Sequence, residues 1–249
     1  MKKLTVLQSG FFLLLGVLSI SACNKNEEGV DESLPAVYQK FYNINAVYQD
    51  GDFVVIESEG IPDHKSPYYT DTEWESDRYT AYDGTNPEFN LNPNRIGEQN
   101  FTFRIPMNPS VDAAHSATPL GPIGVALNGV AIFNQYAGPG DDLEEEINSF
   151  DQYYGHPTGT KTYHYHIEPV YLTATLGSSS LIGFLLDGFP VYGPMEDGEL
   201  VTNDDLDAYH GHSHATADYP DGIYHYHITA EDPYINGDGF YGTAGTVTQ

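Results

Sequence analysis

Two copies of the tetrapeptide Tyr-His-Tyr-His dominate the chemistry that this sequence could perform. The first copy places His164 and His166 two residues apart, and the second does the same with His225 and His227. In a β-strand, residues two apart project from one face and are separated by about 6.6–6.8 Å. Each pair of imidazoles can therefore converge on one metal ion, while the tyrosines project from the opposite face. Strand-borne histidine pairs suit transition metals, and copper and zinc fit nitrogen ligands equally well.

A metal centre needs more ligands than one pair of histidines supplies. His156 and His212 precede the two motifs at matching places, each directly after a glycine, and we expect them to supply the third ligands. A lone histidine is more often a hydrogen-bonded structural residue than a ligand. The further candidate ligands, which have no matching partner in the other copy, are His64, His115, His210 and His214.

Three aspartates are candidates for supporting or acid–base roles. Asp151 and Asp207 precede the two Gly-His segments at comparable distances and could orient an imidazole through its second nitrogen. Asp187 occupies a turn position at which the first copy has Asn128, so its simplest role is that of a turn former. The Asp/Asn difference also allows one copy to be active while the other is a scaffold.

The motifs belong to an internal repeat. Residues 123–133 align with residues 182–192 at a constant offset of 59, and the Gly-His and Tyr-His-Tyr-His segments follow in the same order in both copies. The Asn-Gly and Asp-Gly pairs at the centres of the two aligned segments predict two-residue type I′ hairpins, in which both residues have positive φ. We therefore predict a duplicated hairpin-plus-strand unit packed around a pseudo-two-fold axis.

The remaining pattern predicts a mainly β fold, either a sandwich or a small barrel, with long loops. Short β-branched and aromatic runs are interrupted by many of the 25 Gly and 16 Pro residues. Residues 45–57 predict a hairpin around an Asp-Gly turn, and residues 101–105 predict a strand that ends at Pro106. The long segment 61–99 contains Trp74 and many tyrosines, which favours packing over disorder.

The composition excludes one class of partner. The 249 residues include 36 Asp and Glu against 9 Lys and Arg, a formal charge of −27. Such a surface repels phosphate backbones, so nucleic acid is not expected as a partner. Hydrophobic residues make up 40% and aromatic residues 13%, enough to build a packed core.

The amino-terminal residues predict an export signal. Lys2 and Lys3 precede an apolar run at 11–20, and Ile20-Ser-Ala-Cys23 resembles a bacterial lipobox in which the cysteine becomes lipidated. Cys23 is the only cysteine, so disulfides are not expected. We expect a protein anchored to the lipid bilayer of the bacterial envelope through acyl chains such as palmitate, in the periplasm or at the outer-membrane surface. The predicted divisions are a signal peptide (1–22), a lipidated polar tether (23–36), an N-terminal β region (37–110) and the duplicated domain (111–249).

The two Tyr-His-Tyr-His runs resemble the bacterial YHYH-domain family, and the resemblance covers about residues 45–242. It implies a secreted or envelope protein and a histidine site, without a defined reaction. The family pattern implies one Gly-His after Leu206-Asp207, where this chain has three histidines, so the ligand among them stays open. The supporting segments are residues 60–64, 92–94, 120–124, 127–129, 186–190, 206–207 and 232–234.

Three functions are consistent with these residues. The first is an envelope lipoprotein that binds copper or zinc through the paired histidines and either carries the ion or uses it. The second is a metal-dependent enzyme acting on an extracellular polymer such as a glycan, with the aromatic loop between Tyr68 and Phe89 as its binding platform. The third is a non-catalytic adhesion or glycan-binding module, in which the Tyr/His strands form only a polar sheet surface.

Overall fold

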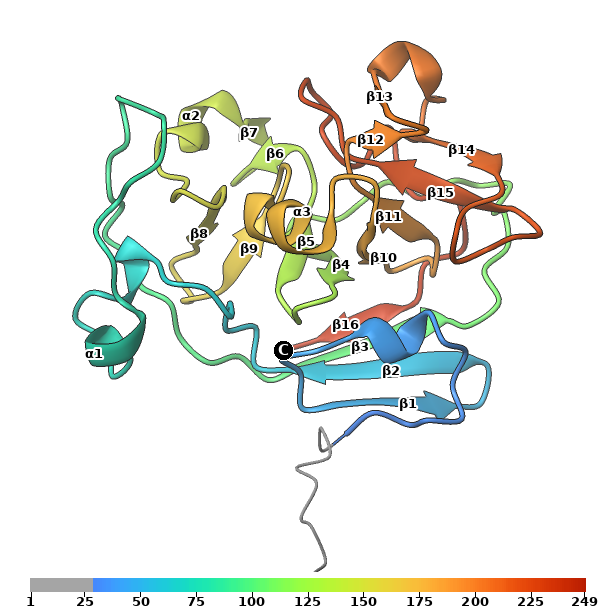
Figure 1. Ribbon diagram of the computed structural model, residues 1–249, viewed down its shortest axis with the longest axis horizontal. Helices are drawn as coiled ribbons and strands as arrows, with labels where there is room; N and C mark the ends of the chain where they lie inside the picture. Colours follow the sequence, from blue (N-terminus) through green and yellow to red (C-terminus); the bar gives the residue numbers. More distant parts are fainter. Residues whose placement is uncertain (1–28) are drawn as a thin grey trace, which may run out of the picture.

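The computed structural model describes residues 29–249, and the predicted signal peptide and Cys23 lie outside this range. Within it, strands in several sheets form most of the regular structure, and the helices are few and short (Figure 1). No sheet in these residues closes into a barrel. The prediction of a mainly β fold is therefore confirmed, and the arrangement is consistent with its sandwich form.

A four-stranded sheet combines both ends of the described chain. The predicted hairpin forms strands β1 (Ala46–Asp50) and β2 (Phe53–Ser58), and the predicted strand at 101–105 is β3 (Phe101–Pro106). Strand β16 (Thr246–Thr248), near the carboxyl end, pairs with β3. The sheet order β1-β2-β3-β16 thus joins the predicted N-terminal region to the last residues of the repeat region.

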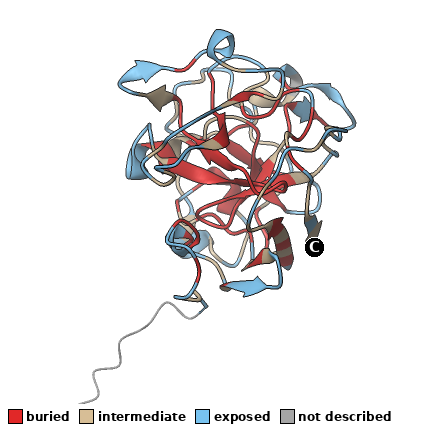
Figure 2. Ribbon diagram, turned by 90° about the vertical axis from the view of Figure 1, so that its right-hand side faces the viewer, coloured by how far each residue is buried: buried red, intermediate tan, exposed pale blue. Residues whose placement is uncertain are grey.

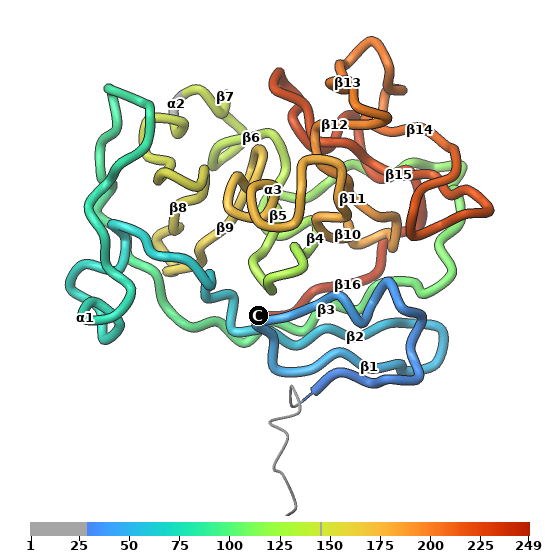
Figure 3. Tube along the Cα trace, in the orientation of Figure 1, coloured from blue at the N-terminus to red at the C-terminus, as the bar shows by residue number. Residues whose placement is uncertain are grey.

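An eight-stranded sheet contains the repeat, and its strand order is symmetrical about its centre. Counted inward from either edge, the equivalent strands of the two copies follow one another in the same order (Figure 3). This symmetry confirms the predicted pseudo-two-fold axis. In order, the strands are β14 (Gly211–His214), β15 (Ile223–His227), β11 (Pro190–Tyr192), β10 (Leu181–Leu185), β4 (Pro122–Ala126), β5 (Ala131–Phe133), β9 (Tyr163–Tyr165) and β8 (Gly155–Pro157).

The hairpin turns of the two copies differ from the expected type. A type I′ turn needs positive φ at both central residues, but Asn128 and Asp187 are not among the residues with positive φ. Only the glycines that follow them adopt it, Gly129 at 79° and Gly188 at 84°. The amide of Gly129 donates to the carbonyl of Ala126 at 2.9 Å. The type I′ prediction is therefore wrong, and each loop has three residues that end in a left-handed glycine.

Short elements surround the sheets. None of the helices within residues 29–249 has the length and apolar character needed to cross a bilayer. The helices are α1 (Glu75–Arg78), α2 (Glu144–Ile147) and α3 (Val170–Leu176), with 3-10 turns η1 (Tyr38–Lys40), η2 (Pro67–Tyr69) and η3 (Asn203–Asp205). Two further hairpins are β6 (Tyr136–Ala137) with β7 (Asp141–Asp142), and β12 (Met195–Glu196) with β13 (Glu199–Leu200).

One buried core lies between the small sheet and the large sheet (Figure 2). The ring of Tyr38, from the segment before β1, packs 5.0 Å from that of Phe184 at the centre of the large sheet. Tyr68 and Tyr69 are 0% exposed, which confirms that the long loop packs. Because they are buried, Tyr68 and Tyr69 cannot belong to the aromatic platform for binding a glycan that the sequence suggested between Tyr68 and Phe89.

The end of the predicted tether is part of the folded structure. Val30 forms a β-bridge with Val47 of β1, and Leu34 is 3% exposed. Residues 29–36 therefore lie against the small sheet, which limits a tether to the residues before them.

Candidate metal centres

Strand pairing places the histidines of each copy together. In the antiparallel pair β8–β9, His156 lies directly opposite His164, and in β14–β15, His212 lies directly opposite His225. Residues directly opposite each other share a face of the sheet. The second histidine of each motif follows two residues later and returns to that face. Each copy therefore gathers three imidazoles at an edge of the eight-stranded sheet.

Both motifs lie in the interior. All eight tyrosines and histidines of the two tetrapeptides are between 0% and 5% exposed. This burial contradicts the interpretation in which alternating Tyr and His form only a polar sheet surface. The tyrosines point into the core and the histidines point into the two clusters described next.

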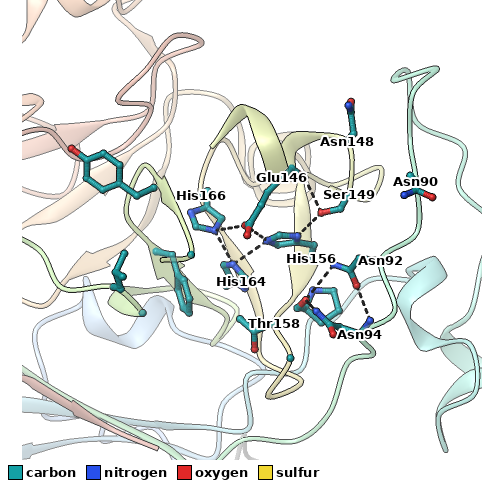
Figure 4. A pocket seen from close by; sticks show the side chains of 17 residues that line it. Asn90, Asn92, Asn94, Glu146, Asn148, Ser149, His156, Thr158, His164 and His166 are labelled. Atoms are coloured by element: carbon teal, nitrogen blue, oxygen red, sulfur yellow. Dashed lines mark hydrogen bonds and ion pairs between the residues drawn. The ribbon is translucent and has the colours of Figure 1, made fainter. Parts of the chain in front are cut away.

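The first centre contains three histidines and a carboxylate at its margin (Figure 4). The Nε2 atom of His164 lies 3.2 Å from that of His156 and 2.8 Å from that of His166. Glu146, from helix α2, places Oε2 3.3 Å from Nε2 of His156 and 3.8 Å from Nε2 of His166. The donors of the three histidines all lie within 4.8 Å of one another, a set that does not include Glu146.

The other ring nitrogen of each imidazole is already hydrogen-bonded. Such a bond at Nδ1 fixes the tautomer and aims Nε2, as is usual for histidines that ligate metals. In two of the three bonds the partner is a backbone carbonyl, which can only accept. The bonds run from Nδ1 of His164 to the Thr162 carbonyl (3.0 Å), from His166 to the Asn134 carbonyl (2.5 Å) and from His156 to the Ser149 hydroxyl (2.6 Å).

These bonds leave two lone pairs facing each other. His164 and His166 carry their protons on Nδ1, so in the neutral rings both Nε2 atoms are acceptors, and an acceptor pair 2.8 Å apart is repulsive unless a cation binds both. Burial is the main cause that holds the pKa of His164 well below its usual value, and the two neighbouring histidines lower it further. Burial also lowers the pKa of His166 to about 4. At neutral pH a proton between these two Nε2 atoms is thus disfavoured. A metal ion with bonds of about 2.0–2.1 Å to both atoms would hold them roughly 2.9–3.3 Å apart.

The second centre contains four histidines and a central carboxylate. Glu196 of β12 places Oε1 2.7 Å from Nε2 of His214, 3.2 Å from that of His227 and 3.6 Å from that of His225. Its other oxygen lies 3.4 Å from Nε2 of His212, which in turn lies 3.0 Å from that of His214. Here the glutamate belongs to the convergent donor set together with His212, His225 and His227.

One Nε2 atom of the second centre is left without a hydrogen-bond partner in the described part of the chain. Nε2 of His225 is buried and has no hydrogen-bond partner among residues 29–249. Burial lowers the pKa of His225 to about 4. A buried acceptor without a partner costs about 1–3 kcal/mol, a cost that a bound ion would remove. The Nδ1 bonds run from His225 to the Ile223 carbonyl (3.0 Å), from His227 to the Gly193 carbonyl (2.9 Å) and from His214 to the Ala215 carbonyl (2.9 Å).

The two glutamates were missed by sequence reasoning. The contact with His156 lowers the pKa of Glu146. Burial raises the pKa of Glu196, but the surrounding histidines outweigh it and the net shift is downward. Glu196 aligns with Ala137 in the 59-residue repeat, so no repeated signal marked it. The two centres obtain their carboxylates from different elements, a helix in one and a hairpin strand in the other.

The His-rich loop of the second copy divides between two roles. His212 and His214 face the centre, but Nε2 of His210 lies 3.0 Å from the hydroxyl of Thr229 instead. His210 has a φ of 74° and occupies the same left-handed position as Tyr154 in the first copy, where φ is 63°. It is therefore a buried turn residue and does not join the donor set.

The two remaining histidines lie outside both centres. Nδ1 of His64 lies 3.1 Å from the Lys65 carbonyl, and the ring packs 4.4 Å from that of Tyr153. His115 stacks on Tyr209 at 4.2 Å. Both fit the structural role that is the commoner one for lone histidines.

Asp151 and Asp207 contact tyrosines, where imidazoles were expected. The Tyr163 hydroxyl donates to both oxygens of Asp151 at 2.9 and 3.0 Å, and that of Tyr224 donates to Asp207 at 2.9 Å. Asp151 also accepts from the hydroxyl of Ser66 at 2.6 Å. These carboxylates hold the tyrosines on the face of the motif opposite the histidines.

Asp187 continues the same pattern beside the second tyrosine of its motif. The Tyr226 hydroxyl donates to Asp187 at 2.6 Å, and burial raises the pKa of this carboxyl to about 6. In the first copy, the amide of Asn128 donates to the Tyr165 hydroxyl at 3.3 Å. Each position thus combines its turn role with support of a buried tyrosine.

Comparison with known proteins finds a matching family, over the region that contains both centres. The profile of the family described as "YHYH protein" matches residues 102–198 and 194–239. The first match contains the histidines of the first centre, and the second contains those of the other. No curated protein and no solved structure matches the chain.

Proposed function

The chain belongs to the YHYH protein family, and from this premise we propose that it binds a divalent transition metal ion, copper or zinc, at each of its two histidine centres. The observation that carries the proposal is the pair of buried Nε2 atoms of His164 and His166. They face each other at 2.8 Å while both Nδ1 atoms donate to carbonyls. The unpartnered Nε2 of His225 supports the same conclusion for the second centre.

The donor set narrows the choice of metal. Imidazole nitrogen with one carboxylate suits zinc and copper, whereas calcium and magnesium require shells of oxygen. Three nitrogens and one carboxylate oxygen match a four-coordinate zinc site, and the same set serves Cu(II). The protein would either carry the ion or use it.

Elemental analysis tests this proposal. Protein purified without chelator and loaded with Zn²⁺ or Cu²⁺ should retain close to two ions per chain after desalting. The double variant His164→Ala/His166→Ala should retain one, and His225→Ala/His227→Ala should also retain one. His115→Ala is the matched control, because this histidine lies outside both centres, and it should retain two. Retention below a tenth of an ion by the wild type, or unchanged retention in both double variants, contradicts the proposal.

We further propose that the protein is an envelope lipoprotein acylated at Cys23. Support comes from the basic start, the apolar run and the small residues before the cysteine. Expression of the full chain in a Gram-negative host with an alkyne analogue of palmitate should label the membrane fraction. Cys23→Ala should abolish the label, and a label that persists in this variant would contradict acylation at that residue.

A further inference from the structure

The first centre opens into a cleft that differs in chemistry from the surroundings of the second. The cleft has a volume of about 520 Å³, within the range of roughly 300–1,000 Å³ that small-molecule sites occupy. All three histidines and Glu146 line it. Figure 4 shows Asn92 and Asn94 beside His156, on the loop that forms the facing wall.

Apart from Glu146, the described wall of this cleft is polar without charged side chains. It contains four asparagines, Asn90, Asn92, Asn94 and Asn148, and no lysine or arginine. A carboxamide both donates and accepts, so it matches hydroxyl groups, which do the same. Among the residues whose side chains the structure describes, Glu146 is the one carboxylate in the lining, and the chain as a whole carries a formal charge of −27. Apart from the proposed ion itself, an anionic ligand finds no counter-charge in the described lining, and the net charge of the chain repels it at long range.

Aromatic side chains provide a second kind of contact. Phe133 and Tyr136 line the cleft, and Tyr136 is 46% exposed although it is a large apolar residue. Asn90 is exposed, and its side chain makes no hydrogen bond within the described residues, so its carboxamide is free for a ligand. A cleft that presents both exposed aromatic surface and an unused hydrogen-bonding group is typical of a site for ligands that have one apolar face and many hydroxyls.

The second centre lacks these features. Its adjoining pocket of about 330 Å³ has no asparagine in its described lining, and its aromatic residue, Tyr192, is only 5% exposed. Charged side chains also line this pocket, among them Lys40, Asp197 and Asp218. Lys40 and Asp218 form an ion pair at 2.5 Å. Glu196 also lies within ligand distance of the histidines there, so that centre is more fully supplied with protein donors. The two copies are thus similar in their histidines and different in what they offer to a ligand.

We propose that the cleft of the first centre binds a neutral carbohydrate, with Tyr136 against the face of a sugar ring and the Asn90 carboxamide on its hydroxyls. The proposal rests on the proposed function only in one respect, that the sugar lies beside a centre that holds an ion. The second centre binds an ion without this ligand. The absence of lysine and arginine from the described lining and the high net negative charge of the chain disfavour acidic polysaccharides as ligands.

Calorimetric titration with oligosaccharides of equal length tests the proposal. The probes are the neutral hexamers of glucose, mannose and xylose in their common β-1,4 linkages, a neutral glycan array, and hexagalacturonate as the anionic counterpart. We expect at least one neutral glycan to bind the metal-loaded wild type with a Kd below about 1 mM, and hexagalacturonate not to bind. Asn90→Ala/Tyr136→Ala should weaken binding at least tenfold, because it removes both free contact groups.

A matched control variant separates this site from the general surface. Asn100→Ala/Tyr79→Ala removes an exposed asparagine and a tyrosine that is 42% exposed, neither of which lines the cleft. It should leave the Kd unchanged. No binding by any neutral glycan, a preference for the anionic hexamer, or equal loss in the two double variants would overturn the carbohydrate proposal.

Metal content measured on the same samples distinguishes this proposal from the proposed function. Neither Asn90 nor Tyr136 belongs to a donor set, so their variant should retain two ions. Wild-type protein that holds two ions and binds no neutral glycan overturns only the carbohydrate proposal. Protein that holds no ion but binds a glycan through Asn90 and Tyr136 overturns only the metal function.

Discussion

Val125 of β4 lies directly opposite Phe184 of β10, and the two residues occupy the same position in the two copies of the repeat. A residue can pair with its own counterpart only where the two-fold axis passes between them. The strands of each copy therefore extend outward from this point, and the histidine strands of the two copies reach opposite edges of the sheet. The arrangement therefore provides two separate centres, one at each edge of the sheet, and does not bring the two histidine pairs into a shared pocket.

The two glutamates should contribute unequally to metal affinity. Glu196 belongs to the convergent donor set, whereas Glu146 lies at the margin of the other set and approaches only two of its histidines. We therefore expect Glu196→Gln to weaken binding at its centre at least tenfold, and Glu146→Gln to weaken binding less than that. Competition with a chromophoric zinc chelator measures both effects. To separate the sites, each substitution is made in the double-alanine background that lacks the other centre. Equal losses in the two variants would contradict the assigned difference.

Asp187 should make folding stability depend on pH. Burial raises its pKa to about 6 in the folded protein, above the usual 3.8. Between these values the folded state holds a proton that the unfolded state has lost, so the free energy of unfolding falls as pH rises. The total fall in the free energy of unfolding is about 3 kcal/mol, because the pKa differs by roughly two units between the two states and each unit corresponds to about 1.36 kcal/mol.

The variant Asp187→Asn isolates this effect. It carries the residue that the first copy has at this position and cannot ionise, so its stability curve should lack the decline. Urea denaturation of EDTA-treated wild type and variant at pH 4, 5, 6 and 7 provides the comparison. The difference in unfolding free energy between the two proteins should shift by about 3 kcal/mol in favour of Asn as pH rises. A difference that stays constant would show that Asp187 is already ionised at the lowest pH.

The tyrosine hydroxyls of the motifs should matter for stability more than for metal binding. Tyr163→Phe removes the hydroxyl that donates to both oxygens of Asp151, a carboxylate that is 0% exposed. A buried acceptor left short of partners costs about 1–3 kcal/mol. Chemical denaturation should show this loss, whereas Tyr79→Phe, at an exposed position, should change stability by less than about 0.5 kcal/mol. Elemental analysis should still find two ions in both variants, and loss of an ion from Tyr163→Phe would contradict the division of roles between the faces.

Much of the histidine arrangement could be predicted because it depends on local geometry. The alternation of a strand places His164 and His166 on one face, and the repeat identifies His156 as their neighbour. The glutamates escaped prediction because they reach the centres from α2 and β12, whose positions depend on tertiary packing, and because Glu196 aligns with an alanine in the repeat. His210 resembled a ligand by its spacing, but the left-handed turn directs its ring towards Thr229.

The turn type escaped prediction for a related reason. Asn-Gly and Asp-Gly favour type I′ hairpins in isolation, but here each turn also packs against the other sheet. A Cβ built on Gly129 would lie 2.5 Å from the Ser58 hydroxyl, and one on Gly188 would lie 2.3 Å from the Pro106 carbonyl oxygen. The three-residue loop brings the glycine into this contact. Local propensity therefore identified the hairpins, and the contact between sheets determined their geometry.

This contact predicts a large difference between two glycine substitutions. Gly51 and Gly188 both have positive φ, at 62° and 84°, so alanine is strained at either position. At Gly51 nothing lies within 4 Å of the added carbon, and Gly51→Ala should cost about 1 kcal/mol. Gly188→Ala adds a clash with the backbone of β3, and overpacking of this kind costs a further 1–3 kcal/mol or so.

Urea denaturation at pH 7 measures both variants against the wild type. Gly188→Ala should lower the midpoint by two to four times as much as Gly51→Ala, because only one of the two glycines separates the sheets. If the second hairpin can move away from β3 at little cost, the two variants will show similar losses. In that case the turn glycine serves only the local backbone conformation, and the close packing of the repeat domain on the small sheet does not depend on it.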